Sequence, residues 1–393
     1  MSPQGNTVAT PVIPLARTWM DDREADAARR AILSGWITQG PEVAAFEREF
    51  AEAVAAPYAC AVSSCTTALH LALVALGIGP GDEVVTVSHS FIAAANVIRQ
   101  SGATPVFVDI CLDTLNIDPA LVERALSPRT KAILAVHQLG MPFDVPAVLA
   151  LATRRGIPLI EDAACAAGSE IRIDGAWERI GAPRGDIACF SFHPRKVLST
   201  GDGGMITTRD GALDREFRLL RQHGMSVPDS VRHGASTVIF ETYPVVGFNY
   251  RLTDIQAAIG REQLRRLPEM VERRRTLAAR YRERLSALSQ IVVAAEPEWA
   301  RSNWQTFHVR LCGDLDQRTV MQRMLDAGIS TRRGVMNAHR EAAYPAGTWS
   351  SPGPLRCSEL AQDRCIMLPL YHQMTDADQD RVITTLTAIV SAT

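Results

Sequence analysis

Between Ala59 and Thr208 the chain alternates short apolar runs with longer stretches of helical periodicity. Six of the apolar runs are predicted strands, at 82–88, 104–109, 131–136, 157–161, 186–192 and 204–208. Predicted helices lie between them, at 66–76, 91–100, 119–126 and 145–155. Continuous apolar strands separated by helices are typical of a mostly parallel sheet that helices cover on both faces. The pattern predicts an α/β fold that binds its ligands at the carboxyl ends of the strands.

The composition excludes several classes of protein. Of the 393 residues, 47% are hydrophobic and 21% are charged, which is ordinary for a packed protein and excludes wholesale disorder. The 41 basic and 43 acidic residues leave a net charge of -2, which argues against nucleic acid or an anionic membrane as the main partner. No segment approaches the roughly 18 apolar residues of a membrane span. The N-terminus lacks the features of a secretory signal.

The cysteines indicate the compartment. The chain has 8 of them, scattered and without a CxxC pair, and several lie inside apolar runs. This spacing supports neither a zinc site nor a disulfide framework. We therefore expect no metal and a reducing, cytoplasmic setting.

The chain is expected to divide into three parts. Residues 1–17, rich in Pro, Thr and Ser, are expected to form a flexible lead. Residues 18–265 are expected to form the large domain and residues 266–393 a smaller C-terminal α/β domain. In the large domain we predict two leading helices, from Met20 to Gly35 and from Pro41 to Val54. In the small domain we predict a strand at 307–312 and helices at 317–327 and 375–390.

A long basic helix is predicted at 261–288, at the junction of these two domains. Pro268 is expected to break or bend it, because proline removes one helical hydrogen bond. Its arginines 273–275 indicate a solvated helix face, with a phosphate-binding patch as the alternative.

Three motifs carry residues of chemical interest. SFHPRKVLSTGDGG, at 191–204, places Lys196 in a polar loop after a strand and follows it with glycines that let backbone approach a ligand. IEDAAC, at 160–165, closes a strand with Asp162. SSCTTAL, at 63–69, opens an apolar helix whose free N–H groups suit an anion such as phosphate. Taken singly, each motif can be explained by a purely structural role: Lys196 as a surface lysine, and the other two motifs as helix caps.

Together the three motifs describe a site for pyridoxal phosphate (PLP). A lysine forms a Schiff base with this cofactor. An acid keeps the pyridine nitrogen protonated, so that the ring withdraws electrons. A helix N-terminus holds the phosphate.

The chain resembles the DegT/StrS family of sugar aminotransferases, within fold type I of the PLP-dependent enzymes. The resemblance runs from about Ile13 to Val390. Six motifs carry it, at 34–51, 63–73, 91–110, 160–169, 189–205 and 247–264, the last being GFNYRLTDIQAAIGREQL. The resemblance implies a large domain with a mostly parallel, seven-stranded type of sheet between helices, and a smaller C-terminal α/β domain.

The resemblance also implies roles for residues at matching positions. Lys196 would carry the Schiff base and move protons, and Asp162 would bind the pyridine nitrogen. Thr66, Thr67 and Ser191 would hold the phosphate.

Two further residues matter at the edge of this site. Phe91 would stack on the cofactor ring, with a core aromatic as the alternative. Asn249 would reach the phosphate of the neighbouring subunit in a homodimer, with a turn or capping role as the alternative.

The chain departs from the family at two positions. Cys165 stands where His or Gln is common, near the cofactor's 3-oxygen, and Cys65 replaces a glycine before the phosphate-binding Thr. A small buried cysteine is the alternative reading of Cys165. Four histidines are each expected to be structural when taken singly: His193, His308, His339 and His372. The basic stretch 331–339 would meet a nucleotide diphosphate or a donor carboxylate, or simply lie on the surface.

The predicted function is transfer of an amino group from L-glutamate or L-glutamine to a keto sugar, most simply a nucleotide-linked one, through Lys196 and pyridoxamine phosphate. A keto-cyclitol is an alternative acceptor. A pyridoxamine-dependent sugar dehydratase and a non-catalytic PLP-binding regulator are the weaker alternatives. Dehydratase relatives replace the lysine with His, whereas this chain has Lys196.

Overall fold

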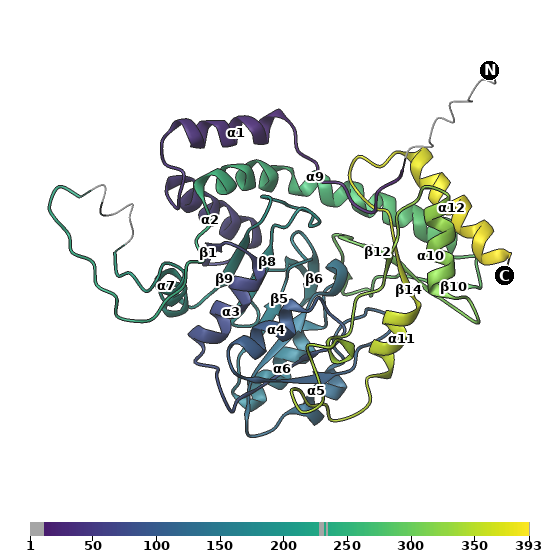
Figure 1. The fold of residues 1–393 in the computed structure, drawn as a ribbon, viewed down its shortest axis with the longest axis horizontal. Coiled ribbons are helices and arrows are strands. Elements are labelled where there is room, and N and C mark those ends of the chain that lie inside the picture. Colours follow the sequence, from purple (N-terminus) through teal and green to yellow (C-terminus); the bar gives the residue numbers. More distant parts are fainter. Residues whose placement is uncertain (1–11, 228–231, 233–234, 393) are drawn as a thin grey trace, which may run out of the picture.

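A computed structural model describes residues 12–227, 232 and 235–392 of the chain (Figure 1). Its central feature is a seven-stranded sheet in the order β1-β9-β8-β5-β4-β2-β3. β9 is antiparallel to both its neighbours, and the remaining neighbouring pairs are parallel. The strands are β1 (Tyr58–Val62), β2 (Glu83–Val87), β3 (Thr104–Val108), β4 (Thr130–Val136), β5 (Leu159–Asp162), β8 (Ile187–Ser191) and β9 (Gly204–Thr208). The prediction of a mostly parallel sheet is confirmed.

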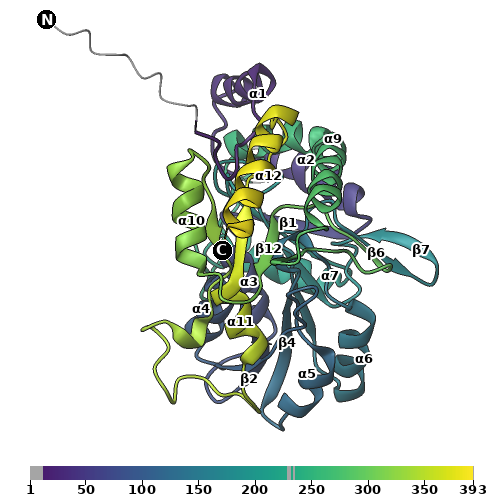
Figure 2. The ribbon, with the colours of Figure 1, turned by 90° about the vertical axis from the view of Figure 1, so that its right-hand side faces the viewer.

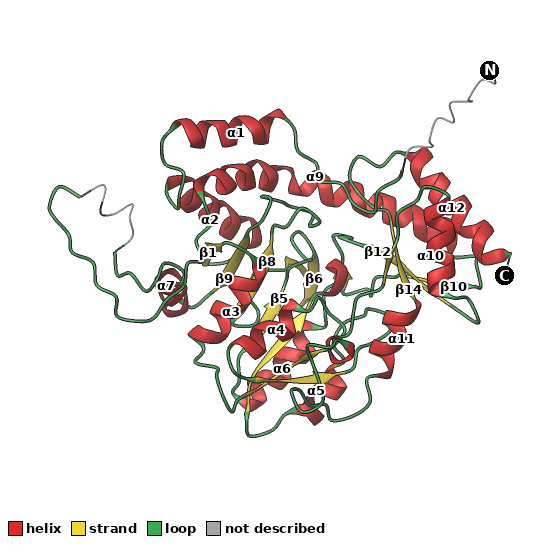
Figure 3. Ribbon diagram, in the orientation of Figure 1, coloured by secondary structure: helices red, strands yellow, loops and turns green. Residues whose placement is uncertain are grey.

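Helices surround this sheet, as the red ribbons around the yellow strands show in Figure 3. Every residue of β2 and β9 is buried, as expected of strands in a sheet that helices cover on both faces. The helices of this part are α1 (Asp22–Leu33), α2 (Pro41–Val54), α3 (Cys65–Ala75), α4 (Ala93–Gln100), α5 (Pro119–Ala125), the short 3₁₀ turn η1 (Gln138–Gly140), α6 (Val145–Arg155) and α7 (Gly211–Leu220).

The long basic helix, α9 (Asp254–Leu285), differs from the prediction. Thr253 caps its N-terminus and exchanges hydrogen bonds with Gln256, so the helix begins at Asp254, ahead of the predicted start at 261. It continues through Pro268 without a break. Contacts with α1 and α2 support the helix along its first half, and in Figure 1 it runs across the top of the molecule to the C-terminal elements.

The arginines at 273–275 form neither a solvated face nor a free phosphate patch. Arg274 is buried and donates hydrogen bonds to the carbonyl oxygens of Trp304, Gln305 and Leu370. Its two neighbours also donate to backbone carbonyls of the C-terminal part, those of Met374 and Ser302. These side chains therefore join α9 to the C-terminal loops, a use that spacing along one helix does not reveal.

A second, four-stranded sheet in the order β10-β12-β14-β13 lies in the C-terminal part, with a hydrophobic core of its own. Its strands are β10 (Ile291–Val293), β12 (Phe307–Leu311), β13 (Arg332–Arg333) and β14 (Cys365–Leu368). The helices of this part are α10 (Gln317–Asp326), the 3₁₀ turn η2 (Ala338–Arg340), α11 (Arg356–Arg364) and α12 (Asp376–Ser391). The strand and the two helices predicted here are confirmed to within one residue at each end.

A third, small sheet was not predicted. Strands β6 (Glu170–Ile173) and β7 (Ala176–Arg179) form a hairpin that stands out at the right of Figure 2. β11 (Ala300–Arg301) pairs with β6 and so connects the hairpin to the C-terminal part of the chain.

Two segments cross between the large sheet and the C-terminal part. The sequence analysis placed residues 12–17 in a flexible lead; in the structure Ile13 is 2% exposed and exchanges backbone hydrogen bonds with Gly328 and Ser330. In the other direction, Ser350 pairs with Val106 of β3. None of the helices in the described ranges is long and apolar enough to span a bilayer.

Candidate active site

Asp162 and Lys196 lie at the carboxyl edge of the large sheet. Asp162 is the last residue of β5, and Lys196 lies in the loop that follows the neighbouring strand β8. The Nζ atom of Lys196 donates a hydrogen bond to Sγ of Cys165, at 3.1 Å. The structure therefore brings together three of the predicted residues, from two loops that are adjacent only in the fold.

The loop that carries Lys196 is held from outside. Thr18 Oγ1 donates to the carbonyl oxygen of Pro194 at 2.8 Å, and Gln305 Nε2 donates to that of Arg195 at 3.0 Å. Within the loop, the backbone N–H of Lys196 donates to the carbonyl of His193. His193 thus shapes the turn before the lysine.

The Asp162 carboxylate is buried and has few partners. Its Oδ1 accepts the N–H of Ala164 at 3.0 Å and lies 3.9 Å from Sγ of Cys65. Burial raises the pKa of Asp162, although the Ala164 N–H and the charge of Lys196 oppose this shift. Among the described residues, no donor reaches the second carboxylate oxygen, which leaves it available to a ligand.

The amine of Lys196 is the positive charge nearest to this carboxylate. Burial lowers its pKa, but the Cys165 contact and the Asp162 charge outweigh burial, and the net shift is upward. A free Lys196 side chain is therefore an ammonium at neutral pH.

The N-terminus of α3 lies close against the start of β9, and we call these two backbone segments the cradle. Ser64 caps the helix, and its Oγ accepts the N–H of Thr67 at 3.1 Å. Gly204 packs directly against this turn, since a Cβ at Gly204 would lie 2.5 Å from the carbonyl carbon of Ser64. In register, Gly204 pairs with both Val62 and Ser191, so Ser191 also lies beside the cradle.

Thr66 and Thr67, the two threonines predicted to bind phosphate, differ in which of their hydrogen-bonding groups are already used. The Thr67 hydroxyl is used locally, because it accepts the N–H of Ser64 at 3.1 Å and donates to the Ser64 carbonyl at 2.8 Å. Neither the N–H nor the hydroxyl of Thr66 has a hydrogen-bond partner in the described part of the chain. Thr66 is therefore the more available of the two to bind an anion.

Phe91 and Asn249 both lie on the surface. The Phe91 side chain is 63% exposed, just after β2, which excludes the alternative of a core aromatic. Asn249 is exposed on a segment held by backbone hydrogen bonds of Phe248 and Tyr250. Within the described ranges, the Asn249 side chain makes no hydrogen bond.

Sequence reasoning missed one residue that supports this site. Asn303 is fully buried, and its Nδ2 donates to the carbonyl oxygens of Cys165 and Ala167, at 2.8 Å in both cases. It therefore holds the loop that follows Asp162 in place. No local pattern marks Asn303, since it lies far along the chain in an irregular segment.

Comparison with known proteins agrees with this geometry. The family model of the DegT/DnrJ/EryC1/StrS aminotransferases matches residues 19–387. The chain belongs to this family. The aminotransferase TlmJ from Streptoalloteichus hindustanus shares 35% identity with it at a TM-score of 0.88, over 97% of this chain and 99% of TlmJ.

Two further solved structures are similar. DesV from S. venezuelae, solved in complex with a ketimine intermediate, shares 34% identity at a TM-score of 0.87, over 97% of this chain and 99% of DesV. The sugar aminotransferase Spr1654 from Streptococcus pneumoniae, in its PMP form, shares 26% identity at a TM-score of 0.89, over 97% and 99% of the two chains. The protein is thus a PLP-dependent aminotransferase of fold type I, in a family that includes sugar aminotransferases.

The remaining predicted candidates of this aminotransferase lie outside the Asp162–Lys196 cluster. His372 stacks on Trp19 with ring centroids 3.8 Å apart. His339 Nδ1 lies 2.7 Å from the hydroxyl of Ser88. His308 is half-buried in β12, where desolvation lowers its pKa to about 4. In the stretch 331–339, Arg332 is exposed.

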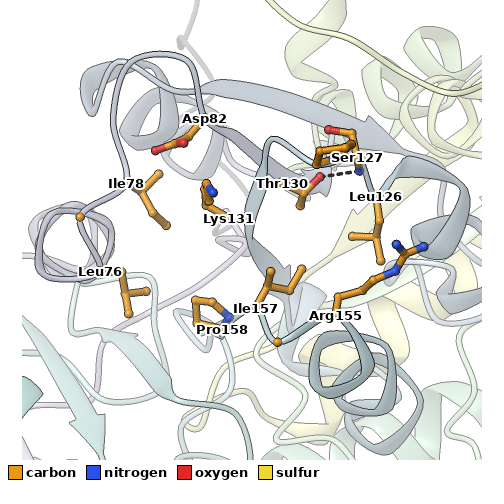
Figure 4. Close-up of a pocket in the computed structure, with 13 residues that line it drawn as sticks. Leu76, Ile78, Asp82, Leu126, Ser127, Thr130, Lys131, Arg155, Ile157 and Pro158 are labelled. Atoms are coloured by element: carbon orange, nitrogen blue, oxygen red, sulfur yellow. Dashed lines mark hydrogen bonds between the residues drawn. The ribbon is translucent and has the colours of Figure 1, made fainter.

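A cavity of about 830 Å³ lies at the opposite edge of the sheet (Figure 4). It contains Lys131, which with Lys196 makes up the two lysines of the sequence. Asp82 and Thr130, which also line it, lie near the amino ends of β2 and β4. Ligands of such sheets bind at the carboxyl ends, where Asp162, Lys196 and the cradle lie. Lys131 therefore lies at the edge of the sheet opposite to Asp162, Lys196 and the cradle.

Proposed function

We propose that the protein transfers an amino group from L-glutamate or L-glutamine to a nucleotide-linked keto sugar, with PLP held at the carboxyl edge of the large sheet. The observation that carries this proposal is the convergence of the buried Asp162 carboxylate and the Lys196 amine beside the cradle of α3. The similar structures include that of the sugar aminotransferase Spr1654, which supports a sugar as the amino acceptor.

The residues at this edge fit the cofactor. The open oxygen of Asp162 would accept the pyridine N–H, and a bound cation would also favour the ionised carboxylate that burial disfavours. Thr66 and Ser191 would hold the phosphate at the N-terminus of α3, which can approach β9 closely because Gly204 has no side chain. Phe91 offers an exposed ring face for stacking.

PLP, when bound, supplies an electron-withdrawing ring that makes the proton on a carbon next to the amino nitrogen acidic. The chain supplies the proton transfers. Lys196 Nζ would accept a proton only as the neutral amine, so its partners Cys165 and Asp162 set the pH at which it acts. Asp162 would keep a proton on the ring nitrogen. Asn303 would keep Cys165 at a constant distance from Lys196.

We further propose a homodimer with active sites shared between subunits. Asn249 is exposed with a free side-chain amide, as a residue that binds across a subunit boundary would be. Large apolar side chains precede it on the same segment, among them Phe240, 88% exposed, and Val246, 90% exposed. Apolar surface of this kind marks protein interaction sites.

We also propose that the enzyme works in the cytoplasm. All eight cysteines are free, which suits a reducing compartment. A keto-cyclitol remains the alternative acceptor, and the presence of Lys196 disfavours the pyridoxamine-dependent dehydratase.

The two-lysine sequence makes the test simple. Purified protein supplied with PLP should show an absorbance band that shifts when L-glutamate is added. Borohydride reduction should add the cofactor's mass to the peptide containing Lys196. Lys131→Arg is the matched control and should behave like the natural protein, whereas Lys196→Arg should not be labelled. Labelling of Lys131 instead, or of neither lysine, would overturn the assignment of the site. Release of 2-oxoglutarate with a panel of keto-sugar nucleotides and keto-cyclitols would identify the acceptor.

A further inference from the structure

The contact between Cys165 and Lys196 joins two reactive groups. Sγ of Cys165 lies 3.1 Å from Nζ of Lys196, and both residues are partly exposed. Asn303 holds the carbonyl of Cys165 and His193 accepts the backbone N–H of Lys196, so neither end of the contact lies on a free loop. Backbone contacts therefore hold both ends of the Cys165–Lys196 pair, and both residues remain partly exposed.

The other cysteines are in different surroundings. Burial raises the pKa of Cys60 and of Cys365 to about 12, and it raises the pKa of Cys65 and Cys189 as well. Reactive cysteines instead sit in partly exposed, electropositive surroundings, which describes Cys165 beside the Lys196 ammonium. Cys312 is partly exposed too, but no lysine contacts it in the described residues, so it is a matched control.

We propose that Cys165 and Lys196 form a hydroperoxide-sensitive modification site, in which oxidation joins the sulfur and the nitrogen in a reversible sulfenamide bond. In the first step the Cys165 sulfur attacks hydrogen peroxide. An S–O bond forms, the O–O bond breaks, and water leaves with the thiol proton, so the sulfur is oxidised to a sulfenic acid and the peroxide is reduced.

In the second step the Lys196 ammonium loses a proton to the solvent, and the neutral amine attacks this sulfur. An S–N bond forms, the S–O bond breaks, and hydroxide leaves with an amine proton as a second water. Condensation of a sulfenic acid with nitrogen is known chemistry for backbone amides, and the 3.1 Å contact places an amine where a thiol or amide would otherwise react. A thiol reductant reverses the bond by attacking sulfur and returning a proton to nitrogen.

The consequence for catalysis rests on the proposed function. Lys196 would be protected from this reaction while its nitrogen holds the cofactor. The pair would be open to oxidation when Lys196 is free and the cofactor carries the amino group. Peroxide would therefore inactivate the enzyme mainly after it has taken the amino group from the donor and before it reacts with the acceptor.

The test uses the protein loaded with pyridoxamine phosphate, treated with hydrogen peroxide and analysed as peptides by mass spectrometry. We expect a linked pair of peptides, containing Cys165 and Lys196, that weighs two hydrogen atoms less than the sum of the free peptides and is separated by dithiothreitol. Loading with PLP should suppress it. Cys312→Ser and Lys131→Arg should leave it unchanged, whereas Cys165→Ser should abolish it.

Lys196→Arg provides a second variant that does not depend on the linked peptide. Without the amine, the Cys165 sulfenic acid should accumulate and be trapped by dimedone. Oxidation of Cys165 to sulfinic acid in the natural protein, with no linked peptide, would overturn the proposal. Since borohydride labelling of Lys196 is measured separately, a linked pair without labelling would contradict the proposed function alone, and labelling without a linked pair would contradict the redox site alone.

Discussion

Sγ of Cys65, the first residue of α3, lies 3.9 Å from Oδ1 of Asp162 and 3.5 Å from the carbonyl oxygen of Cys189. Burial raises the pKa of this thiol, so the sulfur keeps its proton and donates it toward the carboxylate. Cys65, at the position where glycine is usual in the family, is therefore a weak hydrogen-bond donor beside the Asp162 carboxylate. This contact connects the N-terminus of α3 to the end of β5.

Asp162→Asn should keep the fold and lose most activity. Asparagine has nearly the same shape and can still accept the Ala164 N–H, but it cannot hold a proton on the cofactor ring by its charge. Loss of one such electrostatic contribution lowers kcat by about 10²–10³-fold. Steady-state kinetics beside a thermal melt would check this, and near-normal turnover in a well-folded variant would count heavily against the assigned role.

Gly204→Ala should weaken cofactor binding and destabilise the protein. Its Cβ would lie 2.5–2.7 Å from backbone atoms of Ser64 and Cys65, so the start of α3 must move away from β9. Overpacking of this kind costs about 1–3 kcal/mol. Gly79→Ala is the matched control, because its Cβ meets only the Ser101 carbonyl oxygen at 3.7 Å. Equal effects of the two variants on urea unfolding and PLP titration would show that the close approach at Gly204 is unimportant.

Asn303→Ala should loosen the loop that carries Cys165. It removes the donor to the carbonyls of Cys165 and Ala167 and the acceptor for the Gln305 N–H. Leaving buried polar groups unpaired costs about 1–3 kcal/mol for each group that water does not reach. Urea unfolding measures the stability loss, and the yield of linked Cys165–Lys196 peptide should fall with it. An unchanged yield would mean that the contact does not depend on Asn303.

Stability should fall as the pH is lowered from about 6.5 toward 4. Burial lowers the pKa of both His89 and His308 to about 4, whereas the ordinary value is 6.5. Between these pH values the two histidines bind protons in the unfolded chain but not in the folded chain. Lowering the pH therefore stabilises the unfolded state relative to the folded one. Each histidine contributes roughly 3 kcal/mol over the whole interval.

His308→Asn tests this interpretation by comparison of slopes. Between pH 7 and 5 the free energy of unfolding of the variant should depend less steeply on pH than that of the natural protein. Carboxylates titrate equally in both proteins and cancel in the difference. Parallel curves would mean that the pKa of His308 is the same in the folded and in the unfolded protein.

Phe91→Ala should weaken PLP binding without changing stability. The side chain is 63% exposed, so its removal creates no cavity and should change the free energy of unfolding by no more than about 0.5 kcal/mol. Loss of ring stacking should raise the dissociation constant of PLP roughly three- to tenfold. Leu33→Ala, at a side chain 68% exposed on α1, is the control and should change neither quantity.

Local pattern was sufficient for six of the seven strands of the large sheet, and it left out β1. The six strands predicted from 82 to 208 and the four helices between them agree with the structure to within two residues at each end. Each is marked by its own periodicity, its turns and its caps, which are properties of neighbouring residues. The motifs also located Asp162, Lys196 and the opening of α3 at the ligand-binding edge, because parallel strands bring their carboxyl ends to one side.

Contacts between distant segments could not be obtained in this way. The continuity of α9 through Pro268, the burial of Arg274, and the Asn303 clamp depend on partners far along the chain. The 3.1 Å approach of Cys165 and Lys196 is of the same kind, since it depends on how two loops are held after β5 and β8. Residue type and spacing assign chemistry to single positions. Packing in three dimensions determines which side chains contact one another, at what distance, and how deeply each is buried from water.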